Sequence, residues 1–216
     1  TGRLKIMSIS PSNQRKAPSQ KRAQSTVKKV LDGTWEILKE QGAEALSTRS
    51  ISKHTGVSPG SIYQYFGNKE QILFTLYGER LKDSIGAFKL VATDANFALP
   101  LAEFWILQGE ALANVGWGRV EDVELNKAIA ESPLLKDAVK NILNELYDCL
   151  INIMKRYGST WSDNALRHLA EYAFGINHFG YSLRIRQTDE EAKRTAVLTN
   201  ELEYYLICKA INEPSP

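Results

Sequence analysis

Residues 47–65, STRSISKHTGVSPGSIYQY, contain two short helix signals separated by a glycine. Ser47 is a favoured N-cap residue for the first helix, and Gly56 can end it because glycine adopts left-handed backbone angles at little cost. Ser58 followed by Pro59 combines a cap with a proline suited to the first position of the second helix. The stretch therefore predicts a helix-turn-helix, which is a DNA-binding motif but also an ordinary corner of helical proteins.

The second helix of this motif is expected to present small or hydrogen-bonding side chains and no charge. Such a surface suits the major groove of DNA, which is about 12 Å wide and admits an α-helix. Gln64 is the best candidate for reading a base, because a carboxamide can form two hydrogen bonds with adenine. Positive charge lies at the edges of the motif, at Arg49 and Lys69, with Lys21 and Arg22 in the preceding arm. The pattern predicts base recognition at the centre and phosphate contacts at the periphery.

Charge is divided unevenly along the 216 residues, although the net charge is only +2. Residues 1–78 hold twelve Lys or Arg and five Asp or Glu, a net charge of +7, and the remainder carries −5. A basic first third favours a nucleic-acid-binding module, although a solvated basic tail would give the same total. The hydrophobic fraction of 43% is that of a globular protein and argues against disorder.

Several classes of protein are disfavoured by the composition. The longest stretch without Asp, Glu, Lys or Arg, His54–Asn68, is too short and too polar to span a membrane, and no signal-peptide pattern opens the chain. Met7-Ser8 resembles a natural start, which leaves the origin of residues 1–6 open. Because Cys149 and Cys208 are the only cysteines, a reducing, cytoplasmic location fits best.

Helical periodicity and helix-start signals predict an all-α fold of about nine helices, with no strand pattern. Three segments are expected: a flexible basic arm at 1–24, a three-helix helix-turn-helix domain at 25–72, and a helical ligand-binding and dimerisation domain at 73–216. Asn68 can cap the long helix that follows it, with Gln71 completing a capping box. The other helices are expected near residues 26–41, 69–91, 100–115, 123–129, 133–157, 163–186 and 189–212.

Catalytic and metal-binding patterns are missing from the sequence. It has no Gly-rich phosphate loop, no nucleophile elbow and no zinc-ligand spacing. His168 and Glu171 form a single i,i+3 pair, which falls short of a di-iron site. We therefore expect no enzyme, no metal and no cofactor. A helical-bundle enzyme is the rival hypothesis, and a ligand-free architectural DNA-binding protein is a third that the long carboxyl-terminal part disfavours.

Residues 27–73 resemble the DNA-binding domain of the TetR family of bacterial transcription regulators. The resemblance covers about a fifth of the chain and implies a homodimeric, usually repressing regulator whose variable helical domain binds a small molecule. Tyr65 stands where many members have His, and its hydroxyl can still contact phosphate. Tyr63 is either a core aromatic or a phosphate contact. The matching residues, in order, are Gly42, Ser47-Thr48, Ile51, Gly56-Val57-Ser58, Ser61-Ile62-Tyr63, Phe66, Lys69-Glu70 and Leu73.

The resemblance and the residue chemistry together give the expected contacts. The residues expected at DNA are Thr48, Arg49, Ser58, Pro59, Gly60, Ser61, Tyr63, Gln64, Tyr65 and Lys69. Aromatic walls with a few polar groups are typical of small-molecule sites. On that ground the candidates for binding an unidentified effector are Trp105, Gln108, Trp117, Tyr147, Asn177, His178 and Tyr181. A core histidine bonded to backbone is the competing interpretation of His178.

The last two predicted helices are the candidate dimer interface. Both carry apolar side chains at helical spacing, and Gly175 and Gly180 permit close approach of another helix. Two helices from each subunit would form a four-helix interface around a two-fold axis. A dimer of this kind would bind a palindromic operator through recognition helices about 34–36 Å apart, and residues 69–91 would link the two domains.

Overall fold

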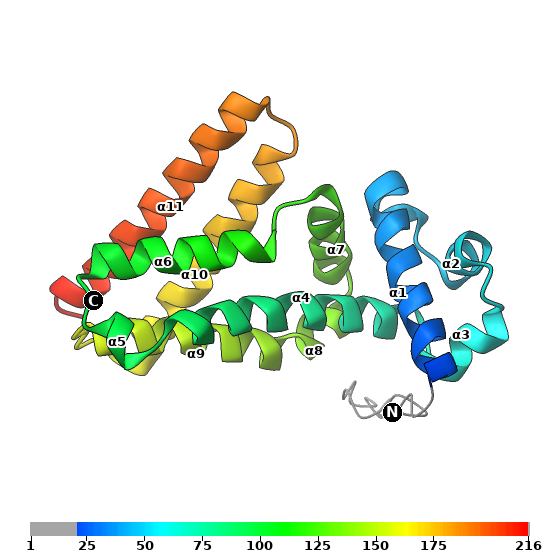
Figure 1. Ribbon diagram of the computed structural model, residues 1–216, viewed down its shortest axis with the longest axis horizontal. Helices are drawn as coiled ribbons and strands as arrows, with labels where there is room; N and C mark the ends of the chain where they lie inside the picture. The colour runs from blue at the N-terminus through cyan, green and yellow to red at the C-terminus, as the bar shows by residue number, and fades with distance from the viewer. Residues whose placement is uncertain (1–20, 216) are drawn as a thin grey trace, which may run out of the picture. The chain divides into compact units, whose positions relative to one another are not determined.

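A computed structural model describes residues 21–215, and within this range helices are the only regular secondary structure (Figure 1). The described part contains eleven α-helices, one short 3-10 helix and no strand, which confirms the predicted all-α class. The elements are α1 (Lys21–Gln41), η2 (Ala43–Ala45), α2 (Thr48–Thr55), α3 (Pro59–Tyr65), α4 (Lys69–Val91), α5 (Asp94–Phe97), α6 (Leu101–Val115), α7 (Val120–Glu131), α8 (Pro133–Ala138), α9 (Lys140–Arg156), α10 (Asp163–Arg184) and α11 (Asp189–Asn212).

The prediction of about nine helices was two too few. The expected break after residue 93 contains α5, which begins because the Thr93 side chain accepts a hydrogen bond from the Asn96 backbone at 3.2 Å. The single helix expected at 133–157 is interrupted at Val139, which separates α8 from α9. Val139 is buried and keeps right-handed helical angles, so no proline or glycine marks this interruption in the sequence.

The start of α1 also corrects the sequence analysis. The flexible arm was expected to extend to residue 24, but the helix begins at Lys21. Lysine, arginine, alanine and glutamine, which make up residues 21–24, all favour helix. The Thr26 hydroxyl donates to the Arg22 carbonyl at 3.0 Å inside this first turn. The rest of the predicted arm, residues 1–20, lies outside the described residues.

The predicted helix boundaries in the motif are confirmed. The Ser47 hydroxyl accepts a hydrogen bond from the Ser50 backbone N–H, and the Ser50 hydroxyl accepts one from the Ser47 backbone N–H. Gly56 ends α2 at φ 68°, in the left-handed region. At the start of α4 the Asn68 side chain accepts from the Gln71 backbone at 2.9 Å, whereas the Gln71 side chain accepts from Gly67 rather than from Asn68.

The chain forms two compact units. Unit 1 holds the described residues up to Glu79 together with Glu124–Lys140, and unit 2 holds Arg80–Val123 and the residues from Asn141 onward. Helices α4 and α7 each continue from one unit into the other. The sequence analysis placed all residues after 72 in the second domain, whereas Glu124–Lys140 belong to unit 1. Sequence order alone does not show which unit a later helix joins.

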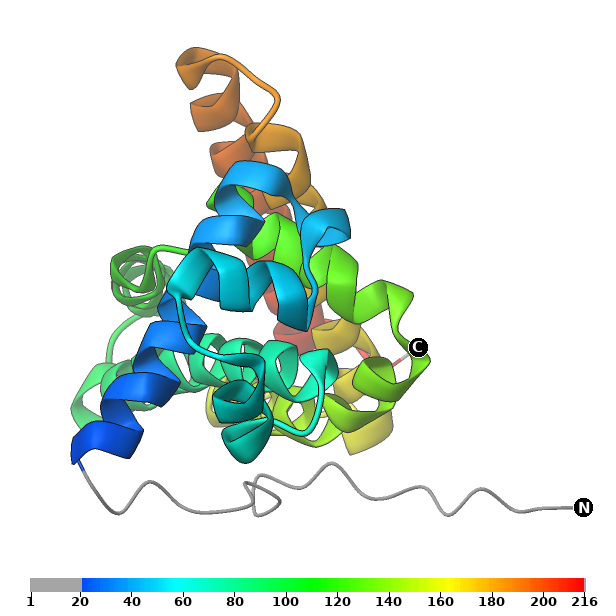
Figure 2. The same ribbon diagram turned by 90° about the vertical axis from the view of Figure 1, so that its right-hand side faces the viewer.

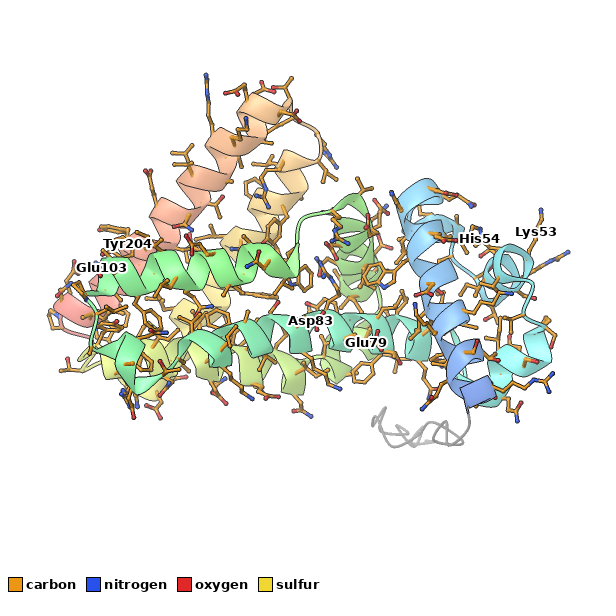
Figure 3. All side chains as sticks on the ribbon, in the orientation of Figure 1. Lys53, His54, Glu79, Asp83, Glu103 and Tyr204 are labelled. Atoms are coloured by element: carbon orange, nitrogen blue, oxygen red, sulfur yellow. The ribbon has the colours of Figure 1, made fainter. Side chains whose placement is uncertain are left out.

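Unit 1 is built around the crossing of α1 over α2 and α3 (Figure 2). Ile51, Ile62 and Phe66 are almost fully buried, as predicted for the core of the motif. His54 is directed towards α1, where its Nε2 lies 2.6 Å from the Glu36 carboxylate, while the exposed Lys53 points away (Figure 3). These contacts fix the short motif helices on α1.

Unit 2 contains the greater part of α4 together with α6, α9, α10 and α11. Helices α10 and α11 run antiparallel and touch where Gly180 faces Thr199, since a Cβ on Gly180 would lie 2.6 Å from the Thr199 hydroxyl oxygen. No helix in the described part of the chain has the length and hydropathy needed to cross a bilayer.

We expect Gly33→Ala to destabilise unit 1. A Cβ at Gly33 would lie 2.2 Å from the Thr55 methyl group, and the Thr55 hydroxyl is held by the Ile51 carbonyl at 2.7 Å. Overpacking of this kind costs about 1–3 kcal/mol, more than the gain from replacing a helical glycine.

The matched control is Gly86→Ala, since no atom lies within 4 Å of the position a Cβ would take there. It should raise the free energy of unfolding by about 0.5–1 kcal/mol. Chemical denaturation of the two variants measures both effects. A Gly33→Ala protein as stable as wild type would contradict the close approach of α1 and α2.

Candidate functional site

The exposed face of α3 is polar and uncharged. Ser58 caps the helix by accepting from the Ser61 backbone at 3.2 Å, and the two hydroxyl oxygens lie 2.8 Å apart. Ile62 and Phe66 anchor the opposite face in the core of unit 1. Five of the residues expected at DNA are exposed on this helix or at its cap, and two more are half-buried. The exposed residues are Ser58, Pro59, Gly60, Tyr63 and Gln64, and the half-buried ones are Ser61 and Tyr65.

Tyr63 lies on the surface with 49% of its side chain exposed, so the structure excludes the core alternative for this residue. Arg49 is exposed, and Thr48 and Lys69 are partly exposed. Among the described residues neither Arg49 nor Lys69 takes part in an ion pair. Both cations are therefore free to meet phosphate groups at the edges of an uncharged surface.

The turn that precedes α2 is tied to the carboxyl-terminal part of α7. Gly42 adopts φ 78°, and the next backbone N–H, that of Ala43, donates to the Glu124 carboxylate at 2.8 Å. Lys127 forms an ion pair with Glu44 at 3.1 Å. Position and orientation of the motif thus depend on α7, which the sequence did not indicate.

Unit 2 encloses a cavity of about 480 Å³ between α4, α6, α9, α10 and α11. Six of the seven candidate effector residues line it together. They are Trp105, Gln108, Trp117, Asn177, His178 and Tyr181. Tyr147 does not line the cavity, because it is buried with its ring edge-on against Phe174 at 5.8 Å between centroids.

Two side chains in the cavity wall carry buried polar atoms that have no hydrogen-bond partner among the described residues. Gln108 is 1% exposed, and both its amide nitrogen and its amide oxygen are unpartnered. His178 Nδ1 lies 3.0 Å from the Phe174 carbonyl, as the core interpretation expected, but its Nε2 is buried without a partner. Burial lowers the pKa of His178 and keeps the ring neutral. Because buried polar groups normally find partners, these atoms make the cavity the candidate ligand site.

Glu203 is the most unusual cavity residue, and the sequence analysis missed it. It lies on α11, and its carboxylate accepts a hydrogen bond from Asn177 Nδ2 at 2.8 Å. Burial raises the pKa of the Glu203 carboxyl to about 7. Thr199, Glu203 and Ile207 are spaced four residues apart and therefore share one face of the helix. This spacing was the sequence signal that could have placed Glu203 beside the other cavity residues. Ser84, Arg184 and Asn200 also line the cavity and were missed.

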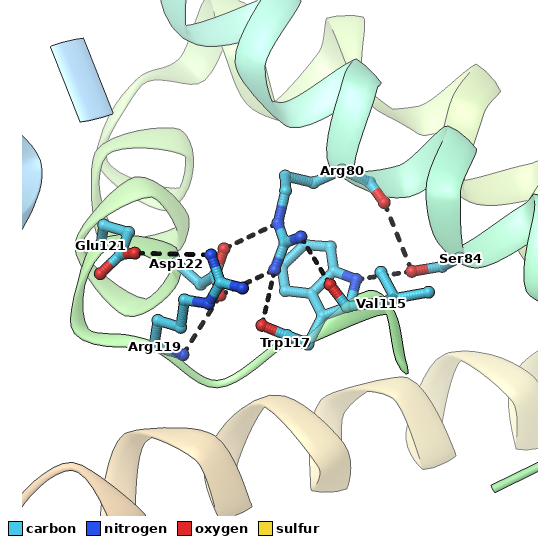
Figure 4. A network of polar contacts seen from close by, with 8 residues as sticks. Arg80, Ser84, Val115, Trp117, Arg119, Glu121 and Asp122 are labelled. Atoms are coloured by element: carbon cyan, nitrogen blue, oxygen red, sulfur yellow. Dashed lines mark hydrogen bonds and ion pairs between the residues drawn. The ribbon is translucent and has the colours of Figure 1, made fainter. Parts of the chain in front are cut away.

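A buried ion pair holds the loop that forms one wall of the cavity (Figure 4). Arg80 on α4 donates to both Asp122 carboxylate oxygens at 2.9 Å and to the Val115 and Gly116 carbonyls at 3.0 Å. Its guanidinium lies 4.7 Å from the centre of the Trp117 ring, whose Nε1 donates to Ser84 at 2.5 Å. The Trp117 side chain is thereby fixed against the cavity.

Comparison with known proteins identifies the amino-terminal part of the chain. Residues 30–76 match the family described as bacterial regulatory proteins, tetR family. This part of the chain is a TetR-type DNA-binding domain. In the TetR-type domain the match covers α2 and α3 completely, together with the second half of α1 and the start of α4.

Two curated transcriptional or metabolic regulators match part of the chain. The HTH-type transcriptional regulator BetI of Rhizobium meliloti is 34% identical over 70 residues, covering 31% of this chain and 34% of that protein. The fatty acid metabolism regulator protein of Bacillus subtilis is 38% identical over 52 residues, covering 24% of this chain and 27% of that protein. The chain thus matches about a third of the length of these relatives.

Solved structures extend the similarity in fold to most of the chain. A TetR-family transcriptional regulator from Syntrophomonas wolfei aligns with a TM-score of 0.67 at 18% identity, covering 86% of this chain and 96% of that one. The fatty acid degradation regulator FadR from Bacillus halodurans aligns with a TM-score of 0.59 at 18% identity, covering 87% and 97%. At this identity the likeness establishes the fold alone.

The raised pKa of Glu203 predicts a pH-dependent stability. The ordinary pKa of a glutamate carboxyl is 4.5, and in the folded protein that of Glu203 is about 7. Between these two pH values the folded protein holds a proton on Glu203 that the unfolded chain has mostly lost. Its contribution to stability is therefore fully present below about pH 4.5 and is lost as the pH rises through about 7. Glu203→Gln stays neutral throughout, so its free energy of unfolding relative to wild type should rise by about 2 kcal/mol from about pH 5 to about pH 8.

Urea unfolding of both proteins at several pH values measures this difference. His178 contributes with the opposite sign, because its pKa is lowered, but it is present in both proteins and cancels. A stability difference that does not change with pH would show that the Glu203 carboxyl titrates alike in the folded and unfolded states.

Proposed function

We propose that this protein is a homodimeric transcriptional repressor that binds a palindromic operator and releases it when a small molecule enters the cavity of unit 2. The observation that carries the proposal is the uncharged, exposed face of α3 flanked by the unpaired cations Arg49 and Lys69, within a TetR-type domain. Acting on bacterial DNA, such a protein works in the cytoplasm. The proposal assigns it no enzymatic reaction.

In this proposal α3 enters the major groove. Gln64 reads a base edge, and Gly60 allows the backbone to approach the DNA, since no protein atom lies within 4 Å of the position its Cβ would take. Arg49 and Lys69 contact phosphates on either side. The remaining contacts are assigned to Thr48, Ser58, Pro59, Ser61, Tyr63 and Tyr65.

Dimerisation through α10 and α11 is supported by an exposed apolar stripe on each helix. On α10, Tyr172 and Phe179 are each 64% exposed and lie on the same face as Gly175, around which there is open space. On α11, Leu198 and Tyr205 are 65% and 58% exposed. Exposed side chains of this size at helical spacing are typical of a helix–helix interface between subunits.

Release of DNA requires the effector to prefer one conformation of the protein. The proposed route runs through the two helices shared by both units. Helix α4 carries Arg80, which lies over the ring of the wall residue Trp117. Helix α7 carries Asp122, which binds Arg80, and Glu124, which binds the turn before α2. A ligand that displaces Trp117 would disturb the Arg80–Asp122 pair and thereby both helices.

Replacing Gln64 by alanine should relax sequence selectivity, because the bidentate contact with a base is lost. Binding to the preferred operator should weaken by about 1–3 kcal/mol, while binding to unrelated DNA should change little. Selection from a random DNA library identifies the operator, and fluorescence anisotropy then compares the variants. Unchanged selectivity in Gln64→Ala would remove this residue from base recognition.

Lys69→Ala serves as the complementary variant in the same measurement. It should weaken all DNA binding and reduce the slope of log affinity against log salt by about 1. The control is Lys82→Ala, an exposed lysine of unit 2 outside the motif. An equal loss of slope in both variants would contradict a phosphate contact specific to Lys69.

A charge placed in the apolar stripe should dissociate the dimer. We expect wild type to sediment as a dimer and Phe179→Asp to sediment as a monomer, because an unpaired carboxylate cannot be buried in an apolar interface. Leu90→Asp is the control, since Leu90 is 75% exposed on α4 and lies outside the stripe. Monomeric wild-type protein, or an equal effect of the two variants, would count against this interface.

A further inference from the structure

We propose that the effector is an organic cation: an amine with an aromatic or other apolar body, whose ammonium group pairs with Glu203 and whose other polar atoms are held by Gln108. The inference rests on the proposed function, because it assigns a chemical class to the ligand of the same cavity. It is argued from the charges and the unpartnered atoms of the cavity wall.

Glu203 supplies a negative charge without a balancing positive one. Its carboxylate lines the cavity and has Asn177 as hydrogen-bond donor, and no cation among the described residues forms an ion pair with it. A carboxylate accepts hydrogen bonds at both oxygens and is costly to bury unpaired. The pKa of this group is accordingly raised by burial alone, with the Asn177 hydrogen bond acting against the shift. An ammonium group on the ligand would provide the missing counter-charge.

Arg184 is the cation of the cavity wall, and its charge is used elsewhere. Its guanidinium lies over the Tyr181 ring at 4.5 Å and beside Gly118, where an added Cβ would come within 2.6 Å of it. The electron-rich face of the ring stabilises the guanidinium without cancelling its charge. Of the two charges in the wall, that of Glu203 is therefore the one left for a ligand.

The rest of the cavity suits the body of such a ligand. Trp105, Trp117, Phe174 and Tyr181 contribute aromatic rings, whose faces attract cations and pack against flat apolar groups. The volume of about 480 Å³ lies within the range of small-molecule sites. Gln108 is fully enclosed with both amide atoms unpartnered, so it can donate one hydrogen bond to the ligand and accept another.

Three matched probes test the assignment by isothermal titration calorimetry on the full-length protein. They share a naphthalene ring and a short chain: 2-(1-naphthyl)ethylamine, 2-(1-naphthyl)ethanol and 3-(1-naphthyl)propionate. We expect the amine to bind more tightly than the alcohol by about tenfold and more tightly still than the acid. Equal or tighter binding of the alcohol or the acid, or no binding of any probe, would overturn the proposal.

Glu203→Gln identifies the residue responsible, since glutamine keeps the acceptor for Asn177 and removes only the charge. Affinity for the amine should fall by about tenfold and become similar to that for the alcohol, which should change little. Glu110→Gln, on the exposed face of α6, should leave all three affinities unchanged. Unchanged amine affinity in Glu203→Gln would overturn the pairing. If this variant fails to fold, the ranking of the three probes on wild type still decides the charge preference.

Operator release separates this inference from the proposed function. Release of DNA by the acid but not by the amine would leave a ligand-responsive regulator and refute the cationic class. Conversely, a protein that binds the amine through Glu203 but binds no DNA sequence would keep the cavity assignment and refute the regulatory function.

Discussion

The buried pair of Arg80 and Asp122 is the interaction on which the arrangement around the cavity depends. Arg80 satisfies a carboxylate, two loop carbonyls and the face of Trp117 at once, and the Asp122 side chain also accepts from the Arg119 backbone at 3.2 Å. Loss of one partner from such a pair leaves an uncompensated buried charge and costs about 3–5 kcal/mol. One electrostatic contact therefore determines the path of the loop between α6 and α7.

The same pair is central to the proposed release of DNA by a ligand. Arg80 and Asp122 lie near the points where α4 and α7 pass from unit 2 into unit 1. Two residues after Asp122, Glu124 binds the turn before α2. In that proposal α4 and α7 carry the displacement, because both helices continue from one unit into the other.

The sequence predicted what depends on local chemistry. Caps at Ser47, Ser58 and Asn68, and the left-handed Gly56, could be identified because their signals lie within a few residues of each other. The interruption at Val139 could not, because it results from packing and carries no helix-breaking residue. Six of the seven candidate effector residues line one cavity and Tyr147 does not. Glu203 was missed because an acidic residue on a predicted interface helix gives no sign of which face it occupies.

The separation between an uncharged α3 face and its charged borders has a consequence for how such a regulator can change over evolutionary time. Under the proposed function, uncharged substitutions at Gly60, Ser61 and Gln64 would alter which bases are preferred without changing the charge. General affinity for DNA, which depends on phosphate contacts, is then retained while a new operator is acquired. A duplicated gene could thus acquire a different target through few mutations, each leaving a protein that still folds and still associates with the chromosome.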